Sequence, residues 1–517
     1  MSASFREYLK TLEKAGELVR VPREVDLRYV SGLIARSERA VLFEKVSGYS
    51  MPVAGGLLSS RERLALAGGD GKEPLTMRVR KALDQPVDPV VVSRAPVKEV
   101  VIKGDDVDLS SLPLPVFSVH DGAPYISCGV ITAKDPQHGM NTGMYRLMFR
   151  DRKTVGIDIV TPNNLRAIYQ KALNQGKGLE ISISLGVHPY EMIAATYKAA
   201  LGISELAIAG GLHGKPVSLA PGETIGVEGL AEAEIVLEGE ILPVGWTYDE
   251  GRFCEFPRLM GGMHVNPLVR IKAITHRKDA IFYALHMPWE NIWMSAPIYE
   301  AAAWRVLREA GVDTVAVNIT PGGCCHWHAV VSIRKHPGDG KNAIMALLSI
   351  ADIKHVTITD DDIDIFDPVD VEWAVATRVQ ADRDVIVIGH ARAKPLDPSL
   401  QPGVQPLTTA KMGIDATIPE GVPKERYERI VYPYYDQIRF DEFMAGKGIA
   451  SSLPGRAKVK DLSESILESL RAKPLYYSEI LDTFREVDYP ALVKTMALLN
   501  EQGKLTRDGM GRYKPKD

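Results

Sequence analysis

Hydrophobic and polar positions follow different periods in successive parts of this chain. In residues 4–37, large apolar side chains recur at helical spacing before a short alternating run at 19–21, which predicts helix, strand and helix. Residues 97–116 are rich in Val and Pro, which predicts a crossing between two domains. The first part of the chain is therefore expected to mix helices and strands.

From about residue 118 to 290, the pattern changes to short runs with period two, separated by turns rich in Gly, Asn and Asp. Such runs predict strands, and their number predicts a β-barrel or sandwich. Helical inserts are expected at 164–174 and 189–201. The clearest strand runs are Tyr145–Phe149, Val155–Val160, Leu179–Leu185 and Glu234–Leu237.

Beyond residue 300, helical segments alternate with apolar strands, which favours an α/β layer. A loop rich in Pro, Gly and Thr is predicted at 395–424, followed by a helix at 433–445. Residues 461–517 contain three helical stretches and then a hairpin that turns at Asp508-Gly509. Three helices and a hairpin resemble a winged-helix module.

Composition narrows the class of protein. At 517 residues the chain exceeds one hydrophobic core, and its 45% hydrophobic and 25% charged residues are ordinary for a soluble globular protein. The net charge of −4, and nine Lys or Arg against ten Asp or Glu in residues 461–517, give no electrostatic reason to expect a nucleic-acid partner. We expect several domains and no nucleic acid.

Cysteine usage and hydropathy indicate the cellular compartment in which the protein is expected. The four cysteines form no CxxC pair and are too few for a disulfide framework, which fits a reducing cytoplasm. The N-terminus lacks the apolar core of a signal peptide, and no apolar run reaches the roughly 18 residues of a membrane span. We expect a cytoplasmic protein with no membrane partner.

Two carboxylates stand out in the segment Glu250-Gly-Arg-Phe-Cys-Glu255, about a hundred residues after Asn141-Thr-Gly-Met-Tyr-Arg146. An arginine between two carboxylates can keep one charged while the other carries a proton, because neighbouring charges push their pKa values apart. Such a set suits a proton-transfer enzyme. An exposed turn flanked by two glutamates is the alternative that the residues alone leave open.

Further motifs accompany this pair, and together they resemble the UbiD family of decarboxylases, which use prenylated FMN. The resemblance covers roughly residues 5–450 and leaves out the C-terminal module. It rests on Asn141-x-Gly-x-Tyr-Arg146, Ser204-Glu-Leu-Ala-Ile-Ala-Gly210, Ala233-Glu-Ile-Val-Leu-Glu-Gly239, Glu250-x4-Glu255, Asp370-Val-Glu-Trp-Ala-Val-Ala-Thr-Arg378 and Lys411-Met-Gly-Ile-Asp-Ala-Thr417.

The resemblance implies a reversible, non-oxidative decarboxylase of an aromatic, heteroaromatic or α,β-unsaturated carboxylic acid. In this family the flavin carries the chemistry, while the protein positions it and manages protons. Arg146 matches the arginine that binds the substrate carboxylate, and Glu255 matches the acid that protonates the carbon left by CO2. Glu250 matches the carboxylate that holds Arg146. These three are the expected catalytic residues.

The resemblance also implies where cofactor and metals bind. Asn141 and Glu205 match ligands of a divalent ion at the FMN phosphate, Mn²⁺ or Mg²⁺, with K⁺ bound beside it. Asn164 stands where the family's third ligand is usually a histidine, which favours Mg²⁺ more than is usual in the family. Lys411 matches a lysine that reaches the phosphate. The expected cofactor-binding residues are Asn141, Met144, Tyr145, Arg146, Asn163, Asn164 and Lys411.

The expected architecture follows from pattern and resemblance together. It comprises an N-terminal α/β region (1–115), a central split β-barrel that binds prenylated FMN (116–300), a C-terminal α/β region for oligomerisation (301–455) and the winged-helix-like module (461–517). The expected partners are the acid substrate, CO2, a flavin prenyltransferase that supplies the cofactor, and a second copy in a homodimer or higher homo-oligomer.

Two other functions stay open at this stage. The chain could be a catalytic or accessory subunit of a multisubunit aromatic carboxylase, for which the C-terminal module offers a docking surface. It could also be a regulator that responds to ligand through its winged helix. His326 and His328, with Trp327, are candidates to line a substrate pocket, or are structural histidines; they do not identify the substrate.

Overall fold

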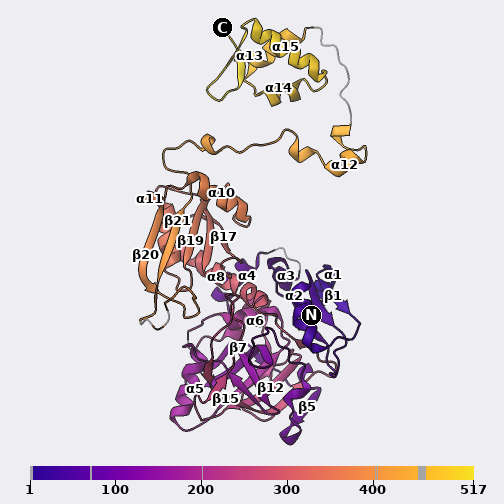
Figure 1. Cartoon of the computed structure of the whole chain (residues 1–517), viewed down its shortest axis with the longest axis vertical. Coiled ribbons are helices and arrows are strands. Elements are labelled where there is room, and N and C mark those ends of the chain that lie inside the picture. Colours follow the sequence, from indigo (N-terminus) through magenta and orange to yellow (C-terminus); the bar gives the residue numbers. More distant parts are fainter. Residues whose placement is uncertain are drawn as a thin grey trace. The chain divides into compact units, whose positions relative to one another are not determined.

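The structure is a computed structural model that describes residues 4–69, 73–200, 202–401, 403, 406–451 and 461–516. The chain forms two compact units, Met1–Glu420 and Gly421–Asp517 (Figure 1). The mixed α/β multidomain fold expected from the sequence is confirmed.

The N-terminal elements confirm the predicted order of helix, strand and helix. Helix α1 (Phe5–Lys14) starts at Ser4, whose hydroxyl accepts the backbone N–H of Glu7 and so caps the helix. Strand β1 (Leu18–Val21) and helix α2 (Val30–Arg36) follow. The sheet of this region has the order β1-β2-β3-β16, with β2 at Ala40–Phe43, β3 at Val53–Gly55 and β16 at Phe282–Tyr283.

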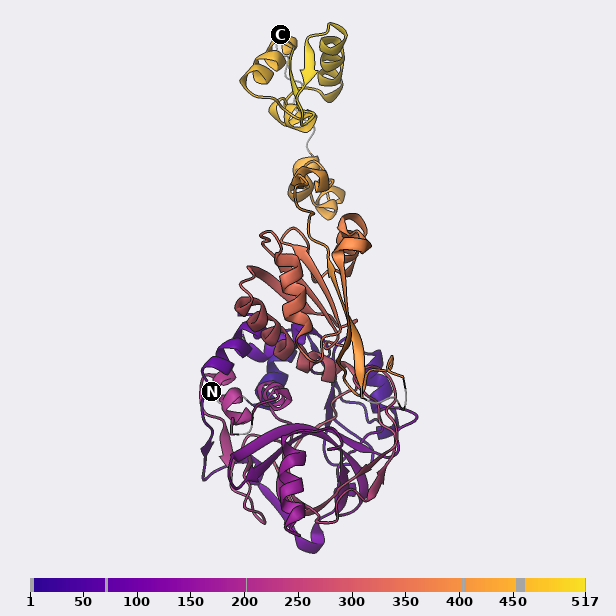
Figure 2. The ribbon, with the colours of Figure 1, turned by 90° about the vertical axis from the view of Figure 1, so that its left-hand side faces the viewer.

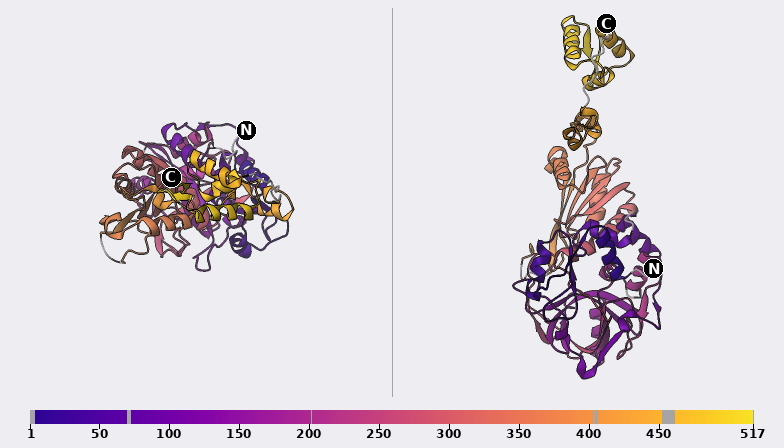
Figure 3. Two further views of the ribbon diagram at one scale, coloured as in Figure 1. Left: turned by 90° about the horizontal axis from the view of Figure 1, so that it is seen from above. Right: turned by 90° about the vertical axis from the view of Figure 1, so that its right-hand side faces the viewer.

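The central region is a closed antiparallel barrel of six strands. The order β12-β9-β6-β7-β8-β15 closes because β15 also pairs with β12, so the barrel, rather than a sandwich, is the correct alternative (Figure 2; Figure 3, right). Closure pairs each of the six barrel strands on both sides, and a seventh strand, β5, also pairs with β15. The strands are β6 (Tyr125–Asp135), β7 (Gly139–Asp151), β8 (Thr154–Ile157), β9 (Leu179–Leu185), β12 (Ile235–Ile241) and β15 (Leu268–His276).

The period-two pattern of these strands separates two apolar clusters. On β6, Val130 belongs to one buried cluster and its neighbour Ile131 to the other, because successive side chains point to opposite faces. Helix α5 (Asn164–Asn174) packs with the cluster of Ile131. Helices α6 (Pro189–Thr196) and α7 (Glu205–His213) pack against the other face of β6 and β7. The predicted helix at 164–174 is confirmed, and the one at 189–201 ends earlier, at Thr196.

The region after residue 288 is the predicted α/β layer. Its sheet has the order β17-β18-β19-β21-β20, and helices α8 and α9 pack on it. The elements are α8 (Trp289–Glu309), β17 (Thr314–Ile319), β18 (His328–Ile333), α9 (Asp339–Leu348), β19 (His355–Asp360), α10 (Pro368–Arg378), α11 (Ala381–Asp384), β20 (Val385–Arg392) and β21 (Thr408–Asp415).

The predicted loop at 395–424 is wrong in its middle part, because Thr408–Asp415 form strand β21. This strand lies between β19, which it joins in parallel, and β20, which it joins antiparallel. Its Gly413, a loop signal in the sequence, is required by packing. A Cβ there would lie 2.1 Å from Cγ2 of Ile344 on α9.

The unit Gly421–Asp517 contains the predicted three helices and hairpin. They are α13 (Leu462–Ala472), α14 (Tyr477–Thr483), α15 (Tyr489–Glu501), β22 (Leu505–Arg507) and β23 (Tyr513–Pro515), and they enclose a hydrophobic core of their own. The helix predicted at 433–445 is wrong in extent. Tyr434 has a left-handed backbone with φ 60°, and α12 spans only Phe440–Met444.

Further α-helices and β-strands complete the first unit. They are α3 (Arg61–Ala65), α4 (Leu75–Asp84), β4 (Val90–Val91), β5 (Val100–Lys103), β10 (Ser218–Ala220), β11 (Gly229–Leu230), β13 (Tyr248–Glu250) and β14 (His264–Asn266). In the part of the chain that the structure describes, none of the helices has the length and apolar character needed to cross a membrane.

Candidate active site

Arg146 on β7 is the centre of a group of acidic side chains. Its Nε and Nη2 donate to the two carboxylate oxygens of Glu250 at 3.0 and 3.1 Å, and its Nη1 donates to Oε1 of Glu255 at 2.5 Å. The structure therefore brings together the three predicted catalytic residues, across more than a hundred positions of sequence. The exposed-turn alternative is wrong, because Glu250 is 0% and Glu255 9% exposed.

Contacts with strand β14 hold Glu250 in place. It lies at the end of β13, paired with β14, and Nδ2 of Asn266 donates to its Oε2 at 2.5 Å. A carboxylate held by a forked arginine and an amide has little freedom to move. Glu250 does not line the adjoining cavity, whereas Arg146 and Glu255 do. Its position suits it to orient the guanidinium.

Two members of this group were not predicted from the sequence. Asp158, just beyond β8, places Oδ2 2.8 Å from Nη2 of Arg146. His264 on β14 has Nδ1 at 3.4 Å from the same nitrogen and 3.9 Å from Oδ1 of Asp158. The available signal was a single acidic residue inside the apolar run Val155–Val160. A carboxylate in such a run is buried only when it has a partner.

The surroundings set the pKa values of these groups. Burial disfavours charge on Arg146, but Glu255, Asp158 and Glu250 outweigh it, so the pKa of Arg146 is raised. Burial raises the pKa of Glu255, and the nearby positive charge of Arg146 only partly offsets it. Burial also acts on Asp158, yet its hydrogen bond with His264 and the charge of Arg146 hold its pKa below the usual value. Glu255 is thus the group prepared to carry a proton.

A cavity of about 530 Å³ opens beside Arg146 and Glu255. One side is formed by β7 and the α5–α7 region of the barrel, and another by α8 and the segment around His326. The cavity is therefore built from segments far apart in the sequence. Its polar lining includes Asn141, Thr142, Arg146, Asp158, Asn163, Asn164, Lys198, Glu205, Glu255, Asn291, Tyr299, His326 and Lys394.

The three predicted metal ligands line this cavity together. Nδ2 of Asn141 donates to Oε1 of Glu205 at 3.0 Å, and the backbone N–H of Thr142 donates to Oε2 at 2.8 Å. Oδ1 of Asn141 is buried and has no hydrogen-bond partner among the described residues. Burial raises the pKa of Glu205 to about 7. An unpartnered amide oxygen beside a buried carboxylate fits a hard divalent cation.

The predicted cofactor-binding residues on β7 and α5 also face the cavity. Met144 and Tyr145 line it from β7, and Asn163 and Asn164 from the start of α5. The Asn163 side chain caps α5 by accepting the backbone N–H of Arg166 at 2.9 Å. The amide of Asn164 donates to the carbonyl of Ala199 at 3.0 Å. This hydrogen bond fixes the side chain of Asn164, which stands where the family usually has a histidine ligand.

Lys411 is the exception, since the structure does not place it on the cavity wall. It lies in β21, 3% exposed, and its Nζ donates to the carbonyls of Leu348 and Ile350 at 2.8 and 2.7 Å. The prediction that it reaches a phosphate does not fit these contacts. The lysines that line the cavity are Lys198 and Lys394, which the sequence pattern did not reveal.

Lys394 belongs to a second charged group at the cavity. Its Nζ is 3.4 Å from Oδ2 of Asp352, which also accepts from Lys198 at 3.0 Å and from the hydroxyl of Tyr299. Burial lowers the pKa of Lys394 to about 8, although Asp352 opposes that shift. This end of the cavity therefore carries two ammonium groups and one carboxylate. The net positive charge suits an anion.

The two histidines singled out in the sequence have different positions. His326 lines the cavity, and its ring lies 4.3 Å from that of Phe256 and 4.7 Å from that of Tyr299. Burial holds its pKa well below the usual value, so the ring is neutral. His328 starts β18, and its Nε2 is 3.3 Å from the hydroxyl of Thr357, away from the cavity. The two histidines do not lie on one strand, because His326 precedes β18.

Comparison with protein families matches three domain models in order along the chain. They are the N-terminal domain (residues 9–83), the Rift-related domain (89–288) and the C-terminal domain (292–416) of 3-octaprenyl-4-hydroxybenzoate carboxy-lyase, or UbiD. The chain belongs to the UbiD family of decarboxylases.

The matches with individual relatives cover nearly the whole length of each relative. The anhydromevalonate phosphate decarboxylase of Methanosarcina mazei is 35% identical over 437 residues, which are 83% of this chain and 99% of that protein. The phenolic acid decarboxylase of Sedimentibacter hydroxybenzoicus is 32% identical over 450 residues, 81% of this chain and 92% of the relative.

Solved structures show the same fold. The UbiD-class enzyme HmfF from Pelotomaculum thermopropionicum in complex with FMN has a TM-score of 0.80 and 39% identity, and the match covers 85% of this chain and 100% of that one. An evolved dimeric form of the same enzyme in complex with prFMN gives a TM-score of 0.78 and 37% identity, covering 86% of this chain and 100% of that one.

Proposed function

We propose that this chain is a prenylated-FMN-dependent decarboxylase, acting reversibly on an aromatic, heteroaromatic or other α,β-unsaturated carboxylic acid. The observation that carries the proposal is the buried set of Arg146, Glu250 and Glu255 at the wall of a cavity in a UbiD barrel. The UbiD-class structure with prFMN supports the choice of cofactor.

Arg146 binds the substrate carboxylate. Its guanidinium stays charged because three carboxylates raise its pKa, and its Nη1 can donate a charge-assisted hydrogen bond to a substrate carboxylate. Glu250 occupies the Nε and Nη2 side of the fork. The Nη1 side, now bonded to Glu255, is the side that a substrate would share.

Glu255 supplies the proton that replaces CO2. Its raised pKa favours a protonated carboxyl, and it borders the cavity 2.5 Å from Arg146. Departure of CO2 leaves an electron pair on the substrate carbon, and transfer of the Glu255 proton there forms the new C–H bond. In the carboxylation direction, the Glu255 carboxylate accepts the proton from the same carbon.

Prenylated FMN, when bound, would supply the electron sink that makes loss of CO2 possible. The protein would hold its phosphate at the end of the cavity lined by Asn141 and Glu205, through a divalent ion, Mn²⁺ or Mg²⁺, with K⁺ beside it. Asn164 would contribute its carbonyl oxygen in place of an imidazole. Lys198 and Lys394 would neutralise the remaining charge, in the role that the sequence assigned to Lys411.

The lining of the cavity supports a flat, partly aromatic substrate. Phe253 lies with its ring 5.3 Å from the Arg146 guanidinium, and Tyr299 and His326 form another wall. One similar protein is named for a phosphate ester and another for phenolic acids, so both kinds of acid belong in the substrate screen. A neutral His326 can donate or accept a hydrogen bond to a ring substituent.

The decisive experiment uses the full chain, purified without oxygen from cells that also produce a flavin prenyltransferase. We expect denaturation to release prenylated FMN, identified by mass, and the loaded protein to release CO2 from at least one acid of an aromatic, heteroaromatic and alkenoic panel. A folded protein that binds no flavin under these conditions would contradict the proposed function. Gel filtration of the same sample tests the proposed homodimer, and fractionation tests the proposed cytoplasmic location.

A further inference from the structure

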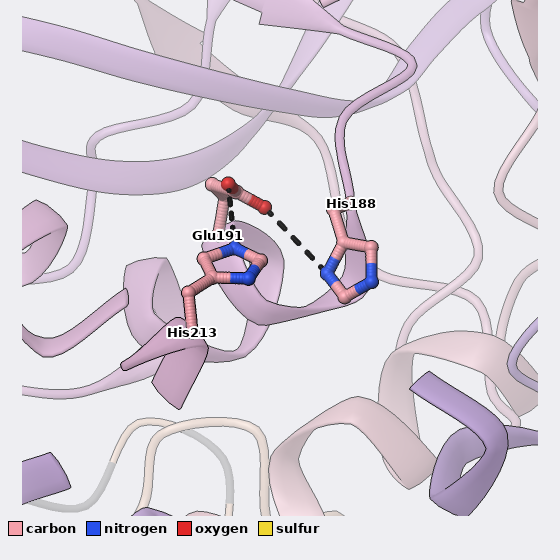
Figure 4. A group of neighbouring side chains, drawn as sticks. All are labelled: His188, Glu191 and His213. Carbon is pink, nitrogen blue, oxygen red and sulfur yellow. Dashed lines mark hydrogen bonds and ion pairs between the residues drawn. The ribbon is translucent and has the colours of Figure 1, made fainter. Parts of the chain in front are cut away.

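A second cluster of potential metal ligands lies on the α6–α7 pair, away from the residues of the candidate active site. It consists of His188, Glu191 and His213, whose ligand atoms all lie within 4.8 Å of one another (Figure 4). None of the three lines the 530 Å³ cavity. Neither the UbiD resemblance nor the proposed decarboxylation uses them.

The geometry of the cluster places one carboxylate between two imidazoles. Oε1 of Glu191 is 3.0 Å from Nε2 of His213, and Oε2 is 3.9 Å from Nδ1 of His188 (Figure 4). Zinc bonds of roughly 2.0–2.1 Å in a tetrahedron place neighbouring ligand atoms about 3.3 Å apart. Nδ1 of His188 also accepts the backbone N–H of Tyr190 at 3.2 Å, so an ion bound by this nitrogen would replace that hydrogen bond.

The cluster holds a polar atom that lacks a partner. The side chains of His188 and Glu191 are 5% and 9% exposed, and that of His213 is 5% exposed. Oε2 of Glu191 is buried without a hydrogen bond in the part of the chain that the structure describes. A buried carboxylate oxygen without a donor is costly unless a cation or proton occupies its lone pairs.

The donor atoms of the cluster are those that zinc prefers. Two imidazoles and one carboxylate favour Zn²⁺ over Mg²⁺ or Ca²⁺.

Space for a fourth ligand adjoins the cluster. A cavity of about 110 Å³ is bordered by all three residues together with Lys215 and Glu232. This volume can hold a water molecule as the fourth ligand of the ion. The three ligand atoms lie within 4.8 Å of one another, which is the spacing for ligands of one ion. The site therefore suits a single ion.

From these contacts we propose that His188, Glu191 and His213 bind one Zn²⁺, completed by a water molecule, as a site separate from the cofactor cavity. His188 and Glu191 belong to the start of α6, and His213 ends α7. The other end of α6, roughly 10 Å along the helix axis, leads to Lys198. The other end of α7, roughly 12 Å along its axis, begins at Glu205. The ion would cross-link the two helices that carry part of the active-site wall.

The test uses the full chain, stripped of metal and without flavin, titrated with Zn²⁺ or Co²⁺ alone. We expect one tight equivalent of Zn²⁺, a rise in Tm when it binds, and intense visible absorption with Co²⁺, as four-coordinate cobalt with imidazole ligands gives. Octahedral Co²⁺ at the oxygen ligands Asn141 and Glu205 absorbs weakly, so the spectrum distinguishes the two sites.

The variant His213→Gln separates metal binding from folding. Its amide can still donate a hydrogen bond to Glu191, so the fold is retained, while the imidazole ligand is gone. We expect this variant to lose the intense Co²⁺ absorption and the Zn²⁺-dependent rise in Tm. The matched control is His138→Gln, at a histidine that also pairs with a carboxylate, Asp135, at 3.1 Å. It should behave as wild type.

Two results would overturn the site. One is a wild-type chain that takes up no Zn²⁺ equivalent and gives no intense Co²⁺ band at metal concentrations well above that of the protein. The other is a His213→Gln variant that keeps both signals. In either case the cluster would be a hydrogen-bonded structural group.

Discussion

Glu250 binds one side of the Arg146 guanidinium, with its Oε1 and Oε2 accepting from Nε and Nη2 at 3.0 and 3.1 Å. Because Nε and Nη2 are both bonded to Glu250, the plane of the guanidinium is fixed. Only Nη1 can exchange its hydrogen bond with Glu255 for one with a substrate. This relationship converts a flexible arginine into a rigid anion-binding group.

Replacing Arg146 by Lys tests the rigid fork. Lysine keeps the positive charge but cannot bond Glu250 in two places and still reach Glu255, so we expect turnover to fall roughly 100-fold or more. Steady-state CO2 release measures the loss. The matched control is Arg150→Lys on the same strand, whose guanidinium stacks on Tyr248 and does not line the cavity. Equal effects of the two substitutions would contradict the role of Arg146.

Glu255→Gln tests the proton donor. The amide preserves the volume but cannot give up a proton at neutral pH, so turnover should fall by about 10² to 10⁴, while the flavin spectrum of the bound cofactor is retained. Asp249→Asn, an exposed carboxylate next to Glu250, is the control. Turnover near wild type in Glu255→Gln would show that another group protonates the product.

The affinity for a divalent ion should depend on pH through Glu205. The pKa of Glu205 is raised to about 7, so its carboxyl is protonated below that pH and charged above it. We expect Mn²⁺ affinity to fall as the pH is lowered through about 7, because protons compete with the ion. Electron paramagnetic resonance of free Mn²⁺ measures this. Glu205→Gln should weaken binding about 100-fold or more and remove the pH dependence.

Anion binding beside Lys394 should decrease at alkaline pH. Lys394 has a pKa lowered to about 8, so its ammonium is charged below that pH and neutral above it. Flavin affinity should therefore fall as the pH rises through about 8, as measured by quenching of FMN fluorescence. Lys394→Arg keeps its charge at alkaline pH and should retain the affinity. A wild-type affinity that stays constant from neutral to alkaline pH would rule out this role for Lys394.

Removing residues 461–517 tests whether the C-terminal module takes part in catalysis. The module encloses its own core, around Ile466, Leu470 and Leu499, so the rest of the chain should fold without it. We expect CO2 release by the truncated protein to stay within about twofold of the full chain. A truncated protein that is folded, binds flavin and is inactive would instead favour a subunit role for the module.

Local patterns in the sequence predicted most of the elements. The strand run at Leu179–Leu185 and the helix at 164–174 have the predicted bounds, because period and capping act over a few residues. Strand β21 was missed, since a segment with Gly413 at its centre becomes a strand only through pairing with β19 and packing of α9. Local signals do not report such contacts.

In the candidate site too, some features follow from sequence motifs and others only from tertiary contacts. The sequence motifs indicated the family and, through that resemblance, the barrel and the set of Arg146, Glu250 and Glu255, because each lies in a segment of recognisable residues. Only the tertiary structure decided that Asp158 and His264 join this group, and that Lys394 rather than Lys411 faces the cavity. The physical reason is that the charge and pKa of a buried group depend on neighbours from distant strands, which a one-dimensional pattern does not specify.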